Sequence, residues 1–165
     1  MQKTVTILEE IKLVGITTRT NNAHIFQQDP TINKIAATVQ KYFHNGLANK
    51  INDRKNPGTT FSAYTNYESD YNGDYTYFIG EEVNSFDEID MEFETLTIEA
   101  QNYIKFTNQP GPMPDVCIDM WKNIWKMNGS DLGGERAYIA DFEIYDQRSL
   151  DHNNVILDIY IGIKK

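Results

Sequence analysis

Long hydrophobic runs and paired cysteines are both missing from this chain of 165 residues. No segment approaches the ~18 consecutive apolar residues of a membrane-spanning helix, and residues 1–16 alternate polar and apolar side chains without a signal-peptide core. Cys117 is the only cysteine, so no internal disulfide can form, which fits a reducing compartment. These features predict a cytoplasmic protein, and the Asn-Gly-Ser pattern at residues 128–130 is therefore not expected to be glycosylated.

Positive charge is also scarce. The chain has 15 Lys and Arg residues against 24 Asp and Glu residues, which gives a formal net charge of −9 at pH 7. An acidic surface repels phosphate backbones, and the chain has neither a basic region nor a separate helix-turn-helix segment, so direct binding of nucleic acid is not expected. The same charge should attract cationic small molecules.

Motifs for cofactors, metals and covalent catalysis are missing as well. Neither a G-x-G-x-x-G pattern nor a Walker loop occurs, and no nucleophile elbow is present. His24, His44 and His152 lack metal-ligand spacing. Cys117 lies among apolar neighbours on a predicted helix, where a core thiol is expected rather than a nucleophile. We therefore predict no cofactor, no metal site and no covalent catalyst.

The most informative feature present is an internal repeat, with halves at about residues 1–83 and 94–165. Each half contains a strand, an amphipathic helix and two closing strands, and the first strand is expected to break near Glu9 and Glu10. The acidic residues 81–94 between the halves are interpreted as a solvated linker rather than a metal site. This order predicts one α+β domain over residues 1–165, in which duplicated β-α-β-β units form an antiparallel sheet with both helices on one side and a central ligand groove.

Apolar spacing marks one helix in each half. In the first half, Asp29 suits the N-cap, Pro30 the first helical turn and Gly46 the exit. The buried stripe of that helix is expected to consist of Ile32, Ile35, Ala36, Val39 and Phe43. In the second half, a helix within residues 111–129 is expected to turn the following residues inward: Val116, Met120, Trp121 and Ile124.

The closing hairpins of the two halves can be aligned with each other. "YTNYESD" (residues 64–70) matches "FEIYDQR" (142–148), and "YFIGEEV" (77–83) matches "IYIGIKK" (159–165). This alignment pairs the following residues: Tyr64 with Phe142, Tyr67 with Tyr145, Ile79 with Ile161 and Gly80 with Gly162. The dipeptide Asn72-Gly73 predicts a tight turn in the first hairpin.

Glu143 stands in the middle of an apolar strand, "RAYIADFEIYDQ" (residues 136–147). Because side chains alternate along a strand, Phe142 and Ile144 should pack on the helices, while Glu143 and Tyr145 face the groove. The repeat adds three more aromatic groove residues: Tyr67, Phe78 and Tyr160. The predicted site is an aromatic box around one glutamate.

A carboxylate walled by aromatic rings is poorly solvated, so its pKa rises and an unpaired charge is costly. A flat organic cation relieves that cost and gains roughly 0.5–2 kcal/mol from each good ring contact. The alternative is that Glu143 lies on a solvated sheet face or pairs with a neighbouring cation such as Lys105 or Arg136. The residues alone leave both interpretations open.

Three stretches resemble the GyrI-like superfamily, the effector-binding domains found behind DNA-binding segments in AraC- and MerR-type transcription regulators. They are "YTNYESDYNGDYTYFIGEEV" (residues 64–83), "YIKFTNQPGPMPDVCIDMWKNIW" (103–125) and "DFEIYDQRSLDHNNVILDIYIGIK" (141–164). The resemblance covers nearly the whole chain. In length and style it is similar to standalone integron-cassette effector-binding proteins, which lack a DNA-binding segment.

In that family the groove binds cationic or amphipathic drugs around a strand glutamate, so the resemblance implies this role for Glu143. It also implies that Trp121 and Trp125 lie near the pocket, without deciding which of them faces it. One departure is Asn102, where the family often has glycine before the tyrosine. The predicted function is therefore capture of a cationic, aromatic or amphipathic small molecule. Two alternatives stay open: a GyrI-like hydrolase of strained electrophilic molecules with Glu143 as general base, or a gyrase-inhibitor-like module that binds a protein partner.

Overall fold

The computed structural model describes residues 1–26, 29 and 32–164. Within these residues, eight strands form one antiparallel sheet in the order β1-β6-β8-β7-β3-β4-β2-β5. The strands are β1 (Gln2–Leu8), β2 (Ile11–Thr20), β3 (Thr60–Thr65), β4 (Tyr75–Glu82), β5 (Glu94–Ile98), β6 (Gln101–Thr107), β7 (Ala140–Tyr145) and β8 (Asp158–Ile163).

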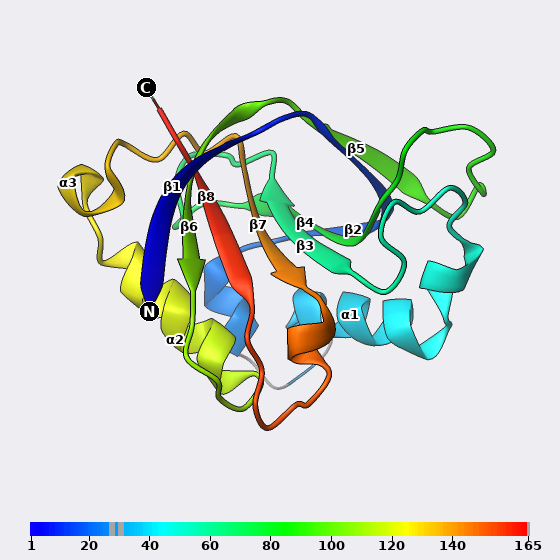
Figure 1. The fold of residues 1–165 in the computed structure, drawn as a ribbon. Helices are drawn as coiled ribbons and strands as arrows, with labels where there is room; N and C mark the ends of the chain where they lie inside the picture. The colour runs from blue at the N-terminus through cyan, green and yellow to red at the C-terminus, as the bar shows by residue number, and fades with distance from the viewer. Residues whose placement is uncertain (27–28, 30–31, 165) are drawn as a thin grey trace.

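Both long helices, α1 (Lys34–His44) and α2 (Asp115–Trp125), lie on the same side of this sheet (Figure 1). Shorter helical segments are α3 (Gly129–Leu132), η1 (Asn22–Phe26), η2 (Leu47–Lys50) and η3 (Gln147–Ser149). The predicted α+β class, with an antiparallel sheet and helices on one side, is therefore confirmed. No helix among the described residues has the length and apolar character needed to span a membrane.

The sheet order is symmetric about the central pair β3–β7. The segments β2-α1-β3-β4 and β6-α2-β7-β8 occupy matching places on either side of it. The edge strands are exchanged between them, because β1 pairs with β6 and β5 pairs with β2. The predicted break near Glu9 and Glu10 is confirmed, and it is the point where the chain leaves β1 for the other half of the sheet.

The strand registers correct the predicted alignment of the two hairpins. Ala63 lies opposite both Phe78 and Phe142, and Phe142 lies opposite Tyr160. If Gly80 is matched to Gly162 as predicted, these registers match Ala63 to Phe142. The predicted match of Tyr64 to Phe142 is therefore wrong by one residue, and Tyr64 corresponds to Glu143. A slip of one residue exchanges the two faces of a strand.

The first hairpin does not close through a two-residue turn at Asn72-Gly73. Residues 66–74 form a longer loop in which the Gly73 N–H donates to the Asp70 carbonyl oxygen at 3.1 Å. The Glu68 N–H donates to the Asp74 carbonyl oxygen at 2.8 Å and closes the loop. Hydrogen bonds within the loop replace the tight-turn geometry that the dipeptide favours.

Helix α1 begins later than predicted. Asn33, not Asp29, is its N-cap, because the Asn33 side chain accepts a hydrogen bond from the Ala36 N–H at 3.1 Å. Pro30 lies outside the described residues. The exit at Gly46 is confirmed, since this glycine adopts φ +60° directly after the helix, in the left-handed region that favours glycine.

The expected buried stripe of α1 is only partly buried. Tyr42 is its fully buried residue, whereas Phe43 is 58% exposed and Ile32 is exposed too. Ile35 and Val39 are half-buried. The reason is that most of this stripe lines a cavity, which is described below. In α2 the inward orientation of Met120, Trp121 and Ile124 is confirmed, while Val116 is half-buried at the edge of the core.

Apolar side chains are buried on both faces of the sheet. On the helix side, α2 packs on β6 and β8 through Ile104 and Ile161, and α1 packs on β2 and β4. The other face carries a third core that includes Phe61, Phe78, Tyr103 and Phe142. This core is closed by residues from the ends of β1, β2, β5 and β6, whose connections arch over the side away from the helices (Figure 1).

The third core overturns one prediction about Glu143 and its neighbours. Phe142 and Ile144 belong to it, so they point away from the helices, and Glu143 and Tyr145 point toward them. The alternation along β7 was predicted correctly, but its direction was not. Because both faces of the sheet are buried, apolar alternation alone does not tell which face the helices cover.

Candidate ligand-binding site

A cavity of about 680 Å³ lies between the two long helices and the helix side of the sheet. Small-molecule sites are commonly clefts of roughly 300–1,000 Å³. Both halves of the chain contribute to its wall, with Ile35 and Val39 from α1 and Trp121 and Trp125 from α2. The sheet supplies its floor, which includes Ser62, Tyr64, Tyr75, Tyr77, Ile79, Glu143 and Tyr145.

Glu143 lies on this floor and is 2% exposed. It belongs to β7, one of the two central strands of the sheet. Its Oε2 atom accepts hydrogen bonds from the Tyr64 hydroxyl at 2.6 Å and from the Trp121 Nε1–H at 2.7 Å. Its Oε1 atom accepts a hydrogen bond from the Tyr145 hydroxyl. The Cys117 thiol lies 3.4 Å from the same hydroxyl. A buried carboxylate is thus held by neutral donors from β3, α2 and β7.

Burial raises the pKa of Glu143 above its usual value. Hydrogen bonds from Tyr145, Tyr64 and Trp121 act in the opposite direction, because they favour the ionised form, but burial outweighs them. Burial also raises the pKa of Cys117 and of both tyrosines well above their usual ranges, and the nearby Glu143 carboxylate adds to each shift. These neighbours therefore stay neutral, and Glu143 is the acid of this cluster.

Aromatic rings surround the carboxylate and brace one another. The Tyr64 ring makes edge-to-face contacts with Tyr75, Tyr77 and Trp121, at centroid distances of 5.4, 5.5 and 5.1 Å. Trp125 lies 6.4 Å from Trp121 and stacks with Tyr71 at 6.0 Å. Both tryptophans line the cavity, which resolves the question of which one faces it. Such interlocked rings hold the wall in a fixed shape.

Neither of the two cations considered as partners of Glu143 pairs with it, although Arg136 lines the same cavity. The Arg136 guanidinium pairs with Asp141 at 2.6 Å, and the Lys105 Nζ atom lies 6.0 Å from the Tyr160 ring centroid. Fully buried Asp141 also accepts hydrogen bonds from the Tyr67 hydroxyl at 2.6 Å and the Gly162 N–H at 2.8 Å. This second buried acid is therefore paired, and it anchors Tyr67 in the cavity wall.

Of the seven residues predicted for the site, five line the cavity: Tyr67, Trp121, Trp125, Glu143 and Tyr145. The placement of Phe78 and Tyr160 in the groove was wrong, because both belong to the third core on the opposite face. Tyr160 stacks there on Phe142 at 4.9 Å. The error has one cause: the groove was expected on the face away from the helices, whereas the cavity lies beneath them.

Sequence reasoning missed Tyr64, Tyr75, Tyr77 and Cys117 as cavity residues. Two of them carried a readable signal. Tyr75, Tyr77 and Ile79 are spaced two residues apart along β4 and therefore share one face of the strand. Correct assignment of the helix-facing side would have placed all three in the cavity. Tyr64 needed the corrected register, which makes it the counterpart of Glu143 in the other half.

Comparisons with known sequences agree with the fold and the three motifs. The family described as "Cass2: Integron-associated effector binding protein" matches residues 4–163. YobU of Bacillus subtilis (strain 168), whose name makes it a candidate transcriptional regulator, is 27% identical over 161 residues, which are 98% of this chain and 97% of that protein.

Solved structures share the same architecture. The integron cassette protein VCH_CASS2, from the mobile metagenome of Vibrio cholerae, is 27% identical with a TM-score of 0.75, over 98% of this chain and 95% of that one. SAV2435, solved with tetraphenylphosphonium bound, is 18% identical with a TM-score of 0.75, over 99% of this chain and 94% of that one, a likeness of fold alone. As the motifs predicted, the chain belongs to the family of integron-associated effector-binding proteins.

Proposed function

We propose that this chain captures cationic, aromatic or amphipathic small molecules in the cavity, with Glu143 as the central acid. The observation that carries the proposal is a buried carboxylate whose hydrogen-bond donors, Tyr64, Trp121 and Tyr145, are all neutral. These donors offset only part of the hydration that Glu143 loses, since its pKa remains raised. A bound cation would supply the missing positive charge.

The surrounding rings add to the attraction. Each aromatic face in good geometry contributes roughly 0.5–2 kcal/mol toward a cation, with the larger values in desolvated sites. The net charge of −9 favours encounter with cations before they enter the cavity. The relative SAV2435 is seen with the lipophilic cation tetraphenylphosphonium, which supports this class of ligand for a protein of the same fold.

We also propose that residues 1–165 act as one effector-binding domain. Each half of the sheet is completed by a strand from the other half, β1 on β6 and β5 on β2. The cavity takes its wall from both α1 and α2. Neither half would therefore carry the site by itself.

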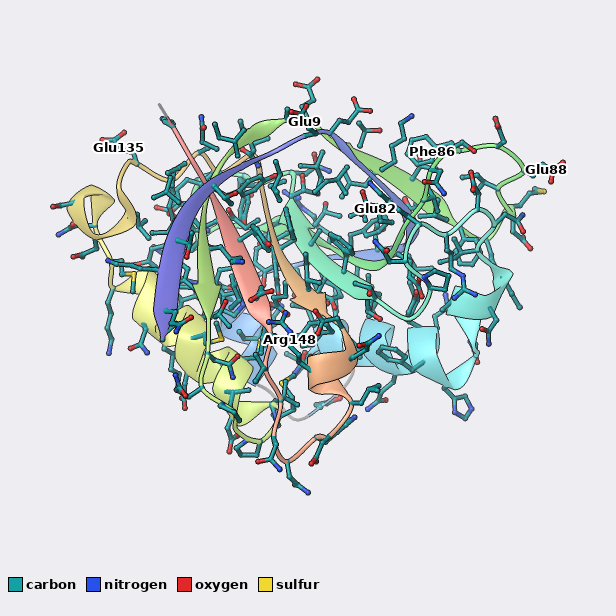
Figure 2. All side chains as sticks on the ribbon, viewed as in Figure 1. Glu9, Glu82, Phe86, Glu88, Glu135 and Arg148 are labelled. Carbon is teal, nitrogen blue, oxygen red and sulfur yellow. The ribbon has the colours of Figure 1, made fainter. Side chains whose placement is uncertain are left out.

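Fluorescence titration with tetraphenylphosphonium tests the proposal, because Trp121 and Trp125 both line the cavity. Glu143→Gln should weaken binding on the order of tenfold or more, since opposite unit charges about 8 Å apart attract by roughly 2 kcal/mol at an effective dielectric constant of about 20. Glu9→Gln is the matched control, because it removes the same charge at the outer surface, on the side away from the helices (Figure 2). Equal affinity of Glu143→Gln and the parent would contradict the proposal.

Hydrolysis of a strained electrophilic molecule, with Glu143 as general base, is the second candidate. The raised pKa of a buried carboxyl favours it. A general base must contact the water that it deprotonates, however, and both Glu143 oxygens already accept hydrogen bonds from side chains. Incubation with a reactive cyclopropane compound separates the two functions: product above the buffer rate that disappears in Glu143→Gln would indicate an enzyme.

A further inference from the structure

Most of the hydrogen-bonding capacity of Glu143 is already used. A carboxylate offers about four lone-pair positions. The Oε2 atom accepts from Tyr64 and Trp121, and the Oε1 atom accepts from Tyr145. Glu143 is also 2% exposed, so little of the carboxyl group can be reached from the cavity. A ligand therefore meets an acid with three of its roughly four acceptor positions taken by the protein itself.

Packing keeps these donors in place. The indole nitrogen of Trp121 can only donate a hydrogen bond. The Trp121 side chain is buried between α2 and the sheet. The Tyr64 ring is wedged between Tyr75, Tyr77 and Trp121, so its hydroxyl cannot swing away without disturbing three ring contacts. Displacing any donor would leave a buried polar group without a partner, which is costly.

We propose that the cavity selects organic cations that carry no N–H groups, such as quaternary ammonium or phosphonium ions, over protonated amines of the same shape. This inference rests on the proposed function and narrows its ligand class. A protonated amine gives up as many as three hydrogen bonds to water on entry, and Glu143 can replace at most one of them. A cation without N–H groups gives up no such bonds, and it still experiences the charge of Glu143 and the faces of the rings.

The ring hydroxyls strengthen this preference. Tyr64 and Tyr145 donate to an anion, and hydrogen bonds in such a chain polarise one another in a low-dielectric site. The negative charge is thereby spread toward the ring faces, where a cation without donors makes its contacts. Asp146, another carboxylate on the cavity wall, pairs with Arg148 at 2.9 Å and so already has a cationic partner.

The test compares 4-phenylbenzylamine, protonated at pH 7.5, with its N,N,N-trimethyl derivative by fluorescence titration. In the parent protein the trimethyl compound should bind more tightly. Its methyl groups add apolar area in the parent and in every variant. The diagnostic quantity is therefore the change, between parent and variant, in the ratio of the two dissociation constants. Tyr145→Phe keeps the ring but frees a position on Oε1, and Tyr64→Phe does the same on Oε2.

Either substitution should shift the ratio about tenfold toward the primary amine, the effect of one hydrogen bond to a charged group. Tyr160→Phe, the same chemical change on the opposite face of the sheet, should leave the ratio unchanged. Tighter binding of the primary amine by the parent, or a ratio that neither Tyr145→Phe nor Tyr64→Phe alters, would overturn this inference alone. Binding of neither cation would overturn the proposed function and this inference together.

Discussion

Removing one partner of the buried ion pair beside the cavity should destabilise the fold strongly. Arg136 and Asp141 lie 2.6 Å apart, with side chains that are 7% and 0% exposed. Replacing Arg136 with methionine leaves the Asp141 carboxylate buried without its cation, a change that costs roughly 3–5 kcal/mol in proteins. Asp141 keeps two donors, the Tyr67 hydroxyl and the Gly162 N–H, so we expect about 3 kcal/mol, the lower end of that range.

Equilibrium unfolding in urea, followed by circular dichroism, measures this loss. Lys50→Met is the control, because it breaks an ion pair with Glu92 in which the two side chains are 52% and 39% exposed. Exposed pairs contribute about 0–1 kcal/mol. The double substitution Arg136→Met with Asp141→Asn should recover part of the loss, since it removes the orphaned charge. If Arg136→Met costs no more than Lys50→Met, the reasoning about the buried pair is refuted.

Two further predictions concern pH and backbone contact. Because burial raises the pKa of Glu143 in the folded protein, cation affinity should fall as the pH falls through that raised pKa. In the ligand-free protein, the stability that Glu143 contributes should instead be complete below its unfolded pKa and be lost as the pH rises through its folded pKa. Glu143→Gln should flatten both profiles, measured by ligand titration and by urea unfolding at several pH values. Unchanged profiles would contradict the raised pKa of Glu143. Gly15 and Gly80 lie opposite each other on β2 and β4, where an added Cβ would meet backbone oxygen atoms at 1.9 and 2.0 Å. Alanine at either position should destabilise the fold by at least 1–3 kcal/mol in urea unfolding, about the cost of overpacking, and a loss below ~0.5 kcal/mol would contradict this contact.

Local patterns in the sequence were sufficient to predict much of the fold. Apolar spacing identified α2 and its buried residues Met120, Trp121 and Ile124, and the break near Glu9 and Glu10 was visible in the charge pattern. These features depend on neighbours within one turn or one strand, which the sequence displays directly. The N-cap of α1 was misjudged because Asp29 and Asn33 both suit a cap, and only the contact with the Ala36 N–H decides between them.

Features that depend on distant parts of the chain were not readable. The exchange of β1 and β5 between the halves is set by pairings between residues 79 to 105 positions apart, and no local pattern predicts them. This exchange also buries the second face of the sheet. Phe78 and Tyr160 lie on that face, as predicted, but they belong to a core and not to a groove. The surroundings of Glu143, an acid among aromatic rings, were predicted correctly, but the face of the sheet on which it lies was not.

The corrected register explains why the acid lies where it does. With Gly80 matched to Gly162, Tyr64 and Glu143 are the same position of the repeated unit, each one residue beyond the central pair Ala63–Phe142. They meet near the centre of the sheet, where the Tyr64 hydroxyl donates to Glu143 at 2.6 Å. In a duplicated unit, the two copies of a position near the symmetry centre lie close together. Here Glu143 supplies the charge at this position, and Tyr64 supplies a neutral hydrogen-bond donor. Two glutamates at this position would repel each other, and two tyrosines would carry no charge, so the divergence of the two halves at this single position gives the cavity its acid.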